Sequence, residues 1–234
     1  MRTAAFKIVF IAGLVTFYGW GAGITNPGFE SYTFDQTLDF NIPTGWQREN
    51  YTAAVQRFIP QPKQGSTENW NIDPEQGLTP FEGDSFVVVS NGSIDPDPDR
   101  GRLWQQVIFA PGEKLSGAYF FGTADYEPYD DHGTIKLLAE SGSGLSDIEI
   151  VSISVSDVGD YSSTAGWVYF ESPVFTELTA GTYTVEIGVY DFANRYYESY
   201  LAVDGLVLVP EPATLFLLGL GTAVMRKQRC NPSF

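Results

Sequence analysis

Apolar residues recur at every second position along much of this chain. From Thr182 to Val189 the apolar positions begin with Tyr183 and end with Val189, with polar or small residues between them. A period of two predicts a strand with one buried face, because successive side chains of a strand point to opposite faces of its sheet. Similar stretches, rich in β-branched and aromatic residues, cover residues 51–59, 85–90, 103–109, 115–121, 134–139, 148–155, 167–175 and 200–209.

Turn residues separate these stretches, among them Asn91-Gly92 and Pro111-Gly112. About nine short strands without an amphipathic helix predict an all-β fold, an antiparallel β-sandwich, and the strand number favours a jelly roll. The apolar phase slips between Ile150 and Val151, which predicts either a β-bulge or a strand covered on both faces. Residues 61–80 contain several prolines and little periodicity, so a long loop is expected there.

The N-terminal end has the three parts of a secretory signal peptide. Arg2 and Lys7 precede an uncharged run that ends at Tyr18, and small residues follow. We interpret this end as a signal-peptide helix that directs export. Cleavage is expected after Gly21 or Gly23, and an uncleaved membrane anchor is the alternative.

The C-terminal end combines an acidic kink, an apolar run and a basic cluster. These are Pro210-Glu211-Pro212, the uncharged run from Ala213 to Met225, and Arg226, Lys227 and Arg229. Cations directly after an apolar run are typical of a stop-transfer segment. As a helix the 13-residue run would span roughly 20 Å, against a hydrocarbon core of roughly 30 Å, so a short transient membrane helix is expected rather than a permanent anchor. A buried C-terminal helix is the alternative.

This tail resembles the PEP-CTERM sorting signal of bacterial exported proteins. The resemblance rests on Pro210-Glu211-Pro212, the glycine-containing apolar stretch and the basic cluster. It implies recognition by an exosortase, a membrane-embedded processing enzyme, with cleavage near the motif and release or surface attachment of the protein. The chain departs from the family pattern in its short apolar run and in the extension from Cys230 to Phe234.

The two ends bracket one predicted domain. We divide the chain into a signal peptide at residues 1–23, a β-sandwich at residues 24–208 and a sorting segment at residues 209–234. Between residues 24 and 210 there are 28 acidic and 8 basic side chains, a formal charge of −20, which argues against nucleic acid as a partner. This charge favours solubility outside the cell or attraction of divalent cations. Cys230 is the one cysteine, so no intramolecular disulfide can form.

A second resemblance concerns the two ends of the domain. The opening Asn26-Pro-Gly-Phe-Glu30, followed by Gly45-Trp46, and the closing strand around Asp204 are similar to motifs of galactose-binding-like jelly rolls, the fold of many carbohydrate-binding modules. The resemblance implies that Glu30 and Asp204 bind a structural calcium ion, with Asp84 as a weaker third candidate. Gly205 stands where the family has a second aspartate. The alternative is that Glu30 accepts backbone hydrogen bonds and that Asp204 caps a strand end.

Catalytic motifs are lacking. His132, the one histidine, lies in an acidic, tyrosine-containing loop, but no G-x-S-x-G nucleophile elbow is present and the domain has no cysteines for a zinc site. Asp95, Asp97 and Asp99 alternate as in a calcium loop, but the glycine and glutamate of an EF-hand are missing, so a solvated loop is favoured. The chain is therefore predicted not to be an enzyme. Paired carboxylates for glycoside hydrolysis stay open, because their separation is spatial.

Sugar binding requires aromatic rings beside polar groups, and two loops contain both. These loops carry Tyr126 with Tyr129, and Tyr196 with Tyr197. We therefore predict an exported, surface-sorted, non-catalytic protein that binds or forms part of an extracellular polysaccharide matrix, with the secretion machinery and an exosortase as partners. A structural matrix protein without a defined ligand, or a secreted glycoside-active hydrolase, are the alternatives.

Overall fold

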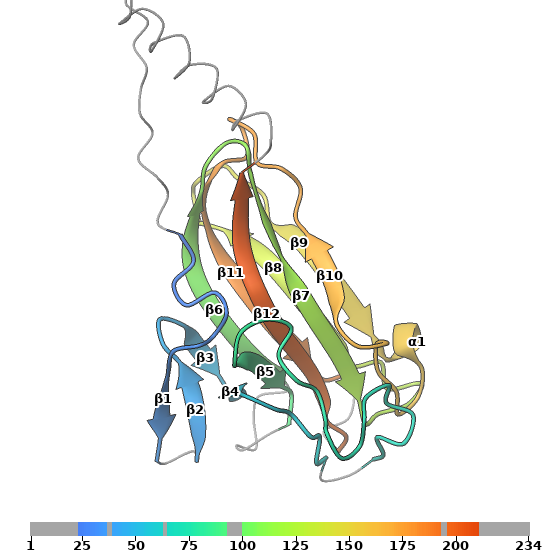
Figure 1. The fold of residues 1–234 in the computed structure, drawn as a ribbon. Helices are drawn as coiled ribbons and strands as arrows, with labels where there is room; N and C mark the ends of the chain where they lie inside the picture. The colour runs from blue at the N-terminus through green and yellow to red at the C-terminus, as the bar shows by residue number, and fades with distance from the viewer. Residues whose placement is uncertain (1–22, 37–38, 63–64, 93–99, 193–195, 211–234) are drawn as a thin grey trace, which may run out of the picture.

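Two five-stranded antiparallel sheets form the body of the protein (Figure 1). The computed structural model describes residues 23–36, 39–62, 65–92, 100–192 and 196–210. The first sheet has the order β10-β7-β12-β5-β4 and the second has the order β3-β6-β11-β8-β9. The first sheet consists of β10 (Val168–Glu171), β7 (Glu113–Thr123), β12 (Ser199–Pro210), β5 (Phe86–Ser90) and β4 (Tyr51–Val55). The second consists of β3 (Gln47–Glu49), β6 (Arg100–Phe109), β11 (Gly181–Tyr190), β8 (His132–Ala139) and β9 (Ile148–Ser154).

A separate two-stranded hairpin precedes the sheets. It pairs β1 (Tyr32–Asp35) with β2 (Phe40–Pro43). In the part of the chain that the structure describes, the one helix is α1 (Val155–Val158). The arrangement confirms the predicted all-β fold, an antiparallel β-sandwich, and each of the nine predicted strands is present.

The predicted bulge is also present. Ile135 on β8 is opposite Val151 on β9, whereas the next residue, Lys136, is opposite Glu149. Ile150 is therefore an extra residue in β9, which explains the slip in its apolar phase. Three short strands, β1 to β3, were not predicted, because they are only 3 to 4 residues long and show little alternation.

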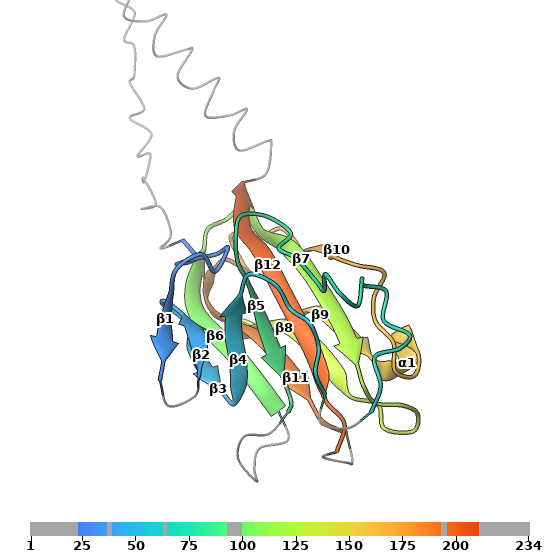
Figure 2. The same ribbon diagram turned by 60° about the horizontal axis from the view of Figure 1, so that its bottom comes forward.

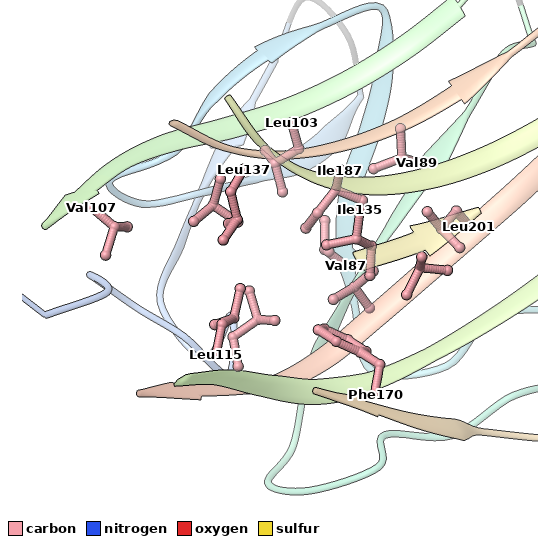
Figure 3. Close-up of a cluster of buried hydrophobic side chains, with 14 of the residues drawn as sticks. Val87, Val89, Leu103, Val107, Leu115, Ile135, Leu137, Phe170, Ile187 and Leu201 are labelled. Carbon is pink, nitrogen blue, oxygen red and sulfur yellow. The ribbon is translucent and has the colours of Figure 1, made fainter. Parts of the chain in front are cut away.

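The main core lies between the two sheets. Figure 3 shows Leu103, Ile135 and Ile187 of the second sheet beside Val87 and Leu201 of the first. All five side chains are fully buried. The inward residues of β11 are the apolar members of the period-two pattern, so the alternation in the sequence corresponds directly to the two faces of the sheet.

The long loop before β5 covers the outer face of the first sheet. Its Trp70 and Leu78 pack with Phe120 and Tyr200 of that sheet in a second hydrophobic cluster. Trp70 Nε1 also donates a hydrogen bond to the carbonyl oxygen of Thr123, at 2.8 Å. The loop therefore stabilises the outer face of the first sheet. The outer face of the second sheet is polar, and this loop does not cover it.

The two predicted terminal helices lie outside the described residues, in 1–22 and 211–234. Within the described ranges no helix has the length and apolar character needed to cross a membrane. The strand β12 extends to Pro210, two residues past the predicted domain boundary at residue 208.

Candidate functional site

Charged and aromatic side chains from several strands meet on the outward face of the second sheet, which we call the open face. The register places Trp104 of β6 opposite Glu186 of β11, and Glu186 opposite Lys136 of β8. In the neighbouring row Glu49 of β3 is opposite Arg102. Because these side chains alternate with buried ones along each strand, they point away from the core together.

Arg102 connects two carboxylates of the open face. Its Nε donates to Glu49 Oε2 at 2.7 Å, and its Nη1 donates to Glu186 Oε2 at 3.0 Å. Arg100 Nε also donates to Glu49 Oε2, at 3.2 Å. Burial acts to raise the pKa of Glu49, but the hydrogen bonds and charges of both arginines outweigh it and hold this pKa below its usual range. Glu49 is therefore ionised at neutral pH.

Tyr190 extends this row towards β8. Its hydroxyl donates to Glu186 Oε1 at 3.0 Å, and its ring stacks on His132 with centroids 5.1 Å apart. A side chain on Gly188 would collide with the Tyr190 ring, so glycine at that position allows the tyrosine to lean along β11. Burial and the neighbouring charge of Glu186 raise the pKa of Tyr190 to about 12, so the hydroxyl stays protonated and can donate.

Aromatic rings lie beside the charged row. The guanidinium carbon of Arg102 lies 5.2 Å from the centre of the half-buried Trp104 ring. Lys136 Nζ lies 6.0 Å from the centre of the Tyr190 ring and pairs with Glu149 at 3.2 Å. The open face thus offers hydrogen-bond donors, acceptors and ring surfaces within a few strands, the combination that hydroxylated ligands require.

His132 also faces this surface. Burial, together with the charge of Lys136, lowers its pKa, so the ring is neutral at pH 7. Its ring stacks on Tyr190. The Asp95 to Asp99 segment lies outside the described residues.

The predicted tyrosine loops come together at one end of the sandwich. Tyr126 contacts Tyr129, Tyr161 and Tyr197, with ring centroids 5.4, 5.6 and 5.6 Å from its own. These four tyrosines are half-buried, whereas Tyr196 is 65% exposed. Three of the four predicted tyrosines thus share one ring cluster, and the sequence analysis missed its fourth member, Tyr161.

Glu30 and Asp204 hold the same turn before β5. Glu30 Oε1 accepts hydrogen bonds from the amides of Asp84 and Ser85, at 2.8 and 3.2 Å. Asp204 Oδ2 accepts from the amides of Phe81 and Glu82, at 2.9 and 3.0 Å. Asp84 therefore contacts Glu30 by a hydrogen bond from its backbone amide.

The charge around this turn bears on the predicted calcium ion. Burial, with a contribution from Glu82, raises the pKa of Asp204 to about 6. Both oxygens of Asp204, like Glu30 Oε1, already accept backbone hydrogen bonds, as the alternative without a metal ion predicts. Within the described ranges no three acidic or histidine side chains form a ready metal cluster, so backbone carbonyls or water would complete the coordination.

The sequence analysis missed the open face, because its partners are distant along the chain. Arg102 and Glu186 are separated by 84 positions. The available signal was the polar alternation itself, since Arg100, Arg102 and Trp104 occupy every second position of one strand. Only the strand register brings that row against Glu186 and Tyr190.

Comparisons with known proteins identify a sorting motif in the tail. A family model for the PEP-CTERM protein-sorting motif matches residues 208–229, which contain Pro210-Glu211-Pro212 and Arg226, Lys227 and Arg229. A search of curated proteins found no match.

Several of the solved structures that are similar to this chain are carbohydrate-binding modules. One is TmCBM61 in complex with β-1,4-galactotriose, at 15% identity and a TM-score of 0.43, over 80% of this chain and 97% of that one. Another is the C-terminal family 22 carbohydrate-binding module of Clostridium thermocellum Xyn10B, at 15% identity and a TM-score of 0.38, over 81% and 98%. A xylan-binding domain of family 22 is 14% identical, with a TM-score of 0.37, over 80% and 97%. These likenesses concern the fold. The chain carries the PEP-CTERM protein-sorting motif, which indicates an exported protein that is processed at a membrane.

Proposed function

We propose that this protein is a non-catalytic, surface-sorted module that binds extracellular polysaccharide through the open face. The observation that carries the proposal is the row Glu49, Arg102, Glu186 and Tyr190, joined by hydrogen bonds of 2.7 to 3.0 Å and bordered by Trp104. A fixed row of this kind costs little ordering entropy when a ligand binds, because its side chains already hold one another in place.

The chemistry of the row suits sugars. The partly exposed carboxylate of Glu49 can accept hydrogen bonds from sugar hydroxyls, and the partly exposed guanidinium of Arg102 can donate to them. The ring of Trp104 offers an apolar surface for the C–H face of a pyranose. Since cross-strand neighbours repeat about every 4.8 Å, successive strands can contact successive hydroxyls of an extended chain.

The tyrosine cluster around Tyr126 is a second candidate surface for the same ligand class. It brings Tyr129 and Tyr197 to one end of the sandwich, as sugar binding by these loops would require. A structural matrix protein without a ligand is the remaining alternative. It predicts that neither surface binds glycans.

Processing and metal binding complete the proposal. We infer that the secretion machinery exports the chain, that an exosortase acts on the tail, and that the body is placed at the cell surface or in its matrix. We also infer one structural calcium ion beside Glu30 and Asp204, because both carboxylates lie at the same turn before β5.

The binding test compares two outward residues of β6. The purified body, residues 24–210, is screened against a panel of soluble polysaccharides, and each hit is titrated with Trp104→Ala and Ile108→Ala. Ile108 is the matched control, because it is 44% exposed on the same strand. The proposal expects about tenfold weaker binding for Trp104→Ala and unchanged binding for Ile108→Ala. Equal affinities for both variants, or no binding to any polysaccharide, would contradict it.

A further inference from the structure

A pocket lies on the other side of the sandwich from the open face, between the first sheet and its covering loop. Its volume is about 240 Å³. Its lining includes Tyr51, Phe58, Ser90, Gly92, Glu198 and Tyr200. Figure 2 shows the strands β4, β5 and β12, which carry its floor, side by side in one layer.

The strand register explains the shape of this pocket. Ser90 on β5 is opposite both Tyr51 on β4 and Tyr200 on β12. A small residue therefore lies between two tyrosines that are two strands apart, roughly 9.6 Å from backbone to backbone. This separation leaves a slot above Ser90 for one ring with a tyrosine on either side.

Other contacts hold the two tyrosines in place. Tyr51 stacks on Phe40 with centroids 5.2 Å apart, yet it is still 43% exposed. The Tyr200 ring lies 5.1 Å from Phe58, and its hydroxyl donates to Glu198 Oε2 at 2.8 Å. The walls are thus preformed, so binding would order few side chains.

Polar groups lie at the floor and the rim of the slot. Ser90 Oγ accepts a hydrogen bond from the amide of Gly92, at 2.9 Å, and keeps its own proton as a donor. A side chain on Gly92 would press against both Ser90 and Glu198, so glycine keeps this corner open. Among the described residues that line the pocket none is basic, and a carboxylate is present, which disfavours anionic ligands.

We propose that this pocket binds a single neutral pyranose ring, as a second sugar site. A pyranose has apolar C–H faces, which suit Tyr51 and Tyr200, and hydroxyls on its edge, which suit Ser90 and Glu198. The volume lies just below the roughly 300–1,000 Å³ of sites for drug-sized ligands, so one ring fits and a long oligosaccharide does not. This inference rests on the proposed function for its ligand class and adds a site on the opposite face. With the open face and this pocket, one molecule could hold one polysaccharide chain along the open face and a single end or branch sugar of another in the pocket.

The test uses the full purified chain and a panel of methyl pyranosides as probes. Binding is followed by saturation-transfer NMR and by titration for the parent, Tyr51→Ala, Tyr51→Phe and Trp104→Ala. Tyr51 is exposed enough for its replacement to leave the fold intact, and Tyr51→Phe keeps the ring. Tyr32→Ala, an exposed aromatic residue on β1, serves as the control. Tetramethylammonium is added as a cationic probe, because aromatic walls with a carboxylate can also bind cations.

The inference expects one or more pyranosides to bind, with roughly tenfold loss in Tyr51→Ala and retention in Tyr51→Phe, Tyr32→Ala and Trp104→Ala. It is overturned if no pyranoside binds, if Tyr51→Ala binds as well as the parent, or if tetramethylammonium binds in place of the sugar. Polysaccharide binding that is lost in Trp104→Ala, with no pyranoside binding to the parent, would support the open face and reject the pocket. Pyranoside binding that is lost in Tyr51→Ala, with no effect of Trp104→Ala on any ligand, would support the pocket and reject the open face.

Discussion

Arg102 on β6 donates a hydrogen bond to Glu186 on β11 at 3.0 Å, and the Glu186 side chain is only 6% exposed. A carboxylate so far removed from water depends on its partner for compensation. The pair therefore stabilises the sandwich in addition to forming the centre of the open face.

Replacing Arg102 with Met should lower the free energy of unfolding by roughly 1–3 kcal/mol, because it leaves Glu186 without its cation while Arg102 itself is partly exposed. Urea unfolding measures the loss. Lys136→Met is the matched control, since its partner Glu149 is 50% exposed, and its cost should stay below about 1 kcal/mol. Equal losses of unfolding free energy in the two variants would show that the burial of Glu186 does not increase the contribution of its ion pair to stability.

Stability should fall as the pH rises from about 4 to about 7. Asp131 is fully buried, and burial raises its pKa to about 7 even though Asn91, Ser199 and Phe192 donate hydrogen bonds to it. An acid whose pKa is raised in the folded state binds more protons there than in the unfolded chain, so its contribution is complete below about pH 4 and is lost through pH 7. Melting temperatures across this range measure the slope. Asp131→Asn should reduce it and leave the part that comes from Asp204, whose pKa is also raised, and a variant with the parent's slope would rule Asp131 out as a source.

Calcium should raise the melting temperature of the body, and a chelator should lower it, because a ligand bound only by the folded state stabilises that state. Asp204→Asn should abolish the response. Asp73→Asn should not, since Asp73 also accepts two backbone hydrogen bonds but lies in an exposed turn. A melting temperature that chelator leaves unchanged would reject the structural ion, and Glu30 and Asp204 would then act through the turn's hydrogen bonds alone.

Tyr126→Ala should lower the free energy of unfolding by about 1–3 kcal/mol, because Tyr126 is the ring that the other three tyrosines of the cluster contact. Thermal or urea unfolding measures this. Tyr196→Ala, in an exposed position of the neighbouring loop, should change stability by less than about 0.5 kcal/mol. If both variants also weaken glycan binding, this end of the sandwich contacts the ligand.

Processing of the tail can be read from the mature product by mass spectrometry. In a host with an exosortase, the exported protein should end near Pro210-Glu211-Pro212, and changing these three residues to alanine should prevent that cleavage. A host without the enzyme is the control. A mature protein that still ends at Phe234 would argue against cleavage.

The strands could be predicted because burial on one face leaves a period-two signal along each of them. The prediction began β6 at Leu103, whereas the strand begins at Arg100, since outward arginines carry no apolar signal. The tyrosine loops were found because their residues are close in sequence. The slot between Tyr51 and Tyr200 could not be predicted from the sequence. It exists because both tyrosines are opposite Ser90, and this strand register is determined by the turns and crossovers of the fold.

The strand β12 begins beside the pocket and ends where the sorting motif begins. Tyr200 lies near its start and Pro210 at its end, and ten steps of about 3.3 Å separate them by roughly 33 Å. Figure 1 shows this strand running along the length of the sandwich. A protein attached to a surface through its C-terminal end would therefore display the pocket at its far tip, with β12 as a rigid spacer that sets how far from the membrane it reaches.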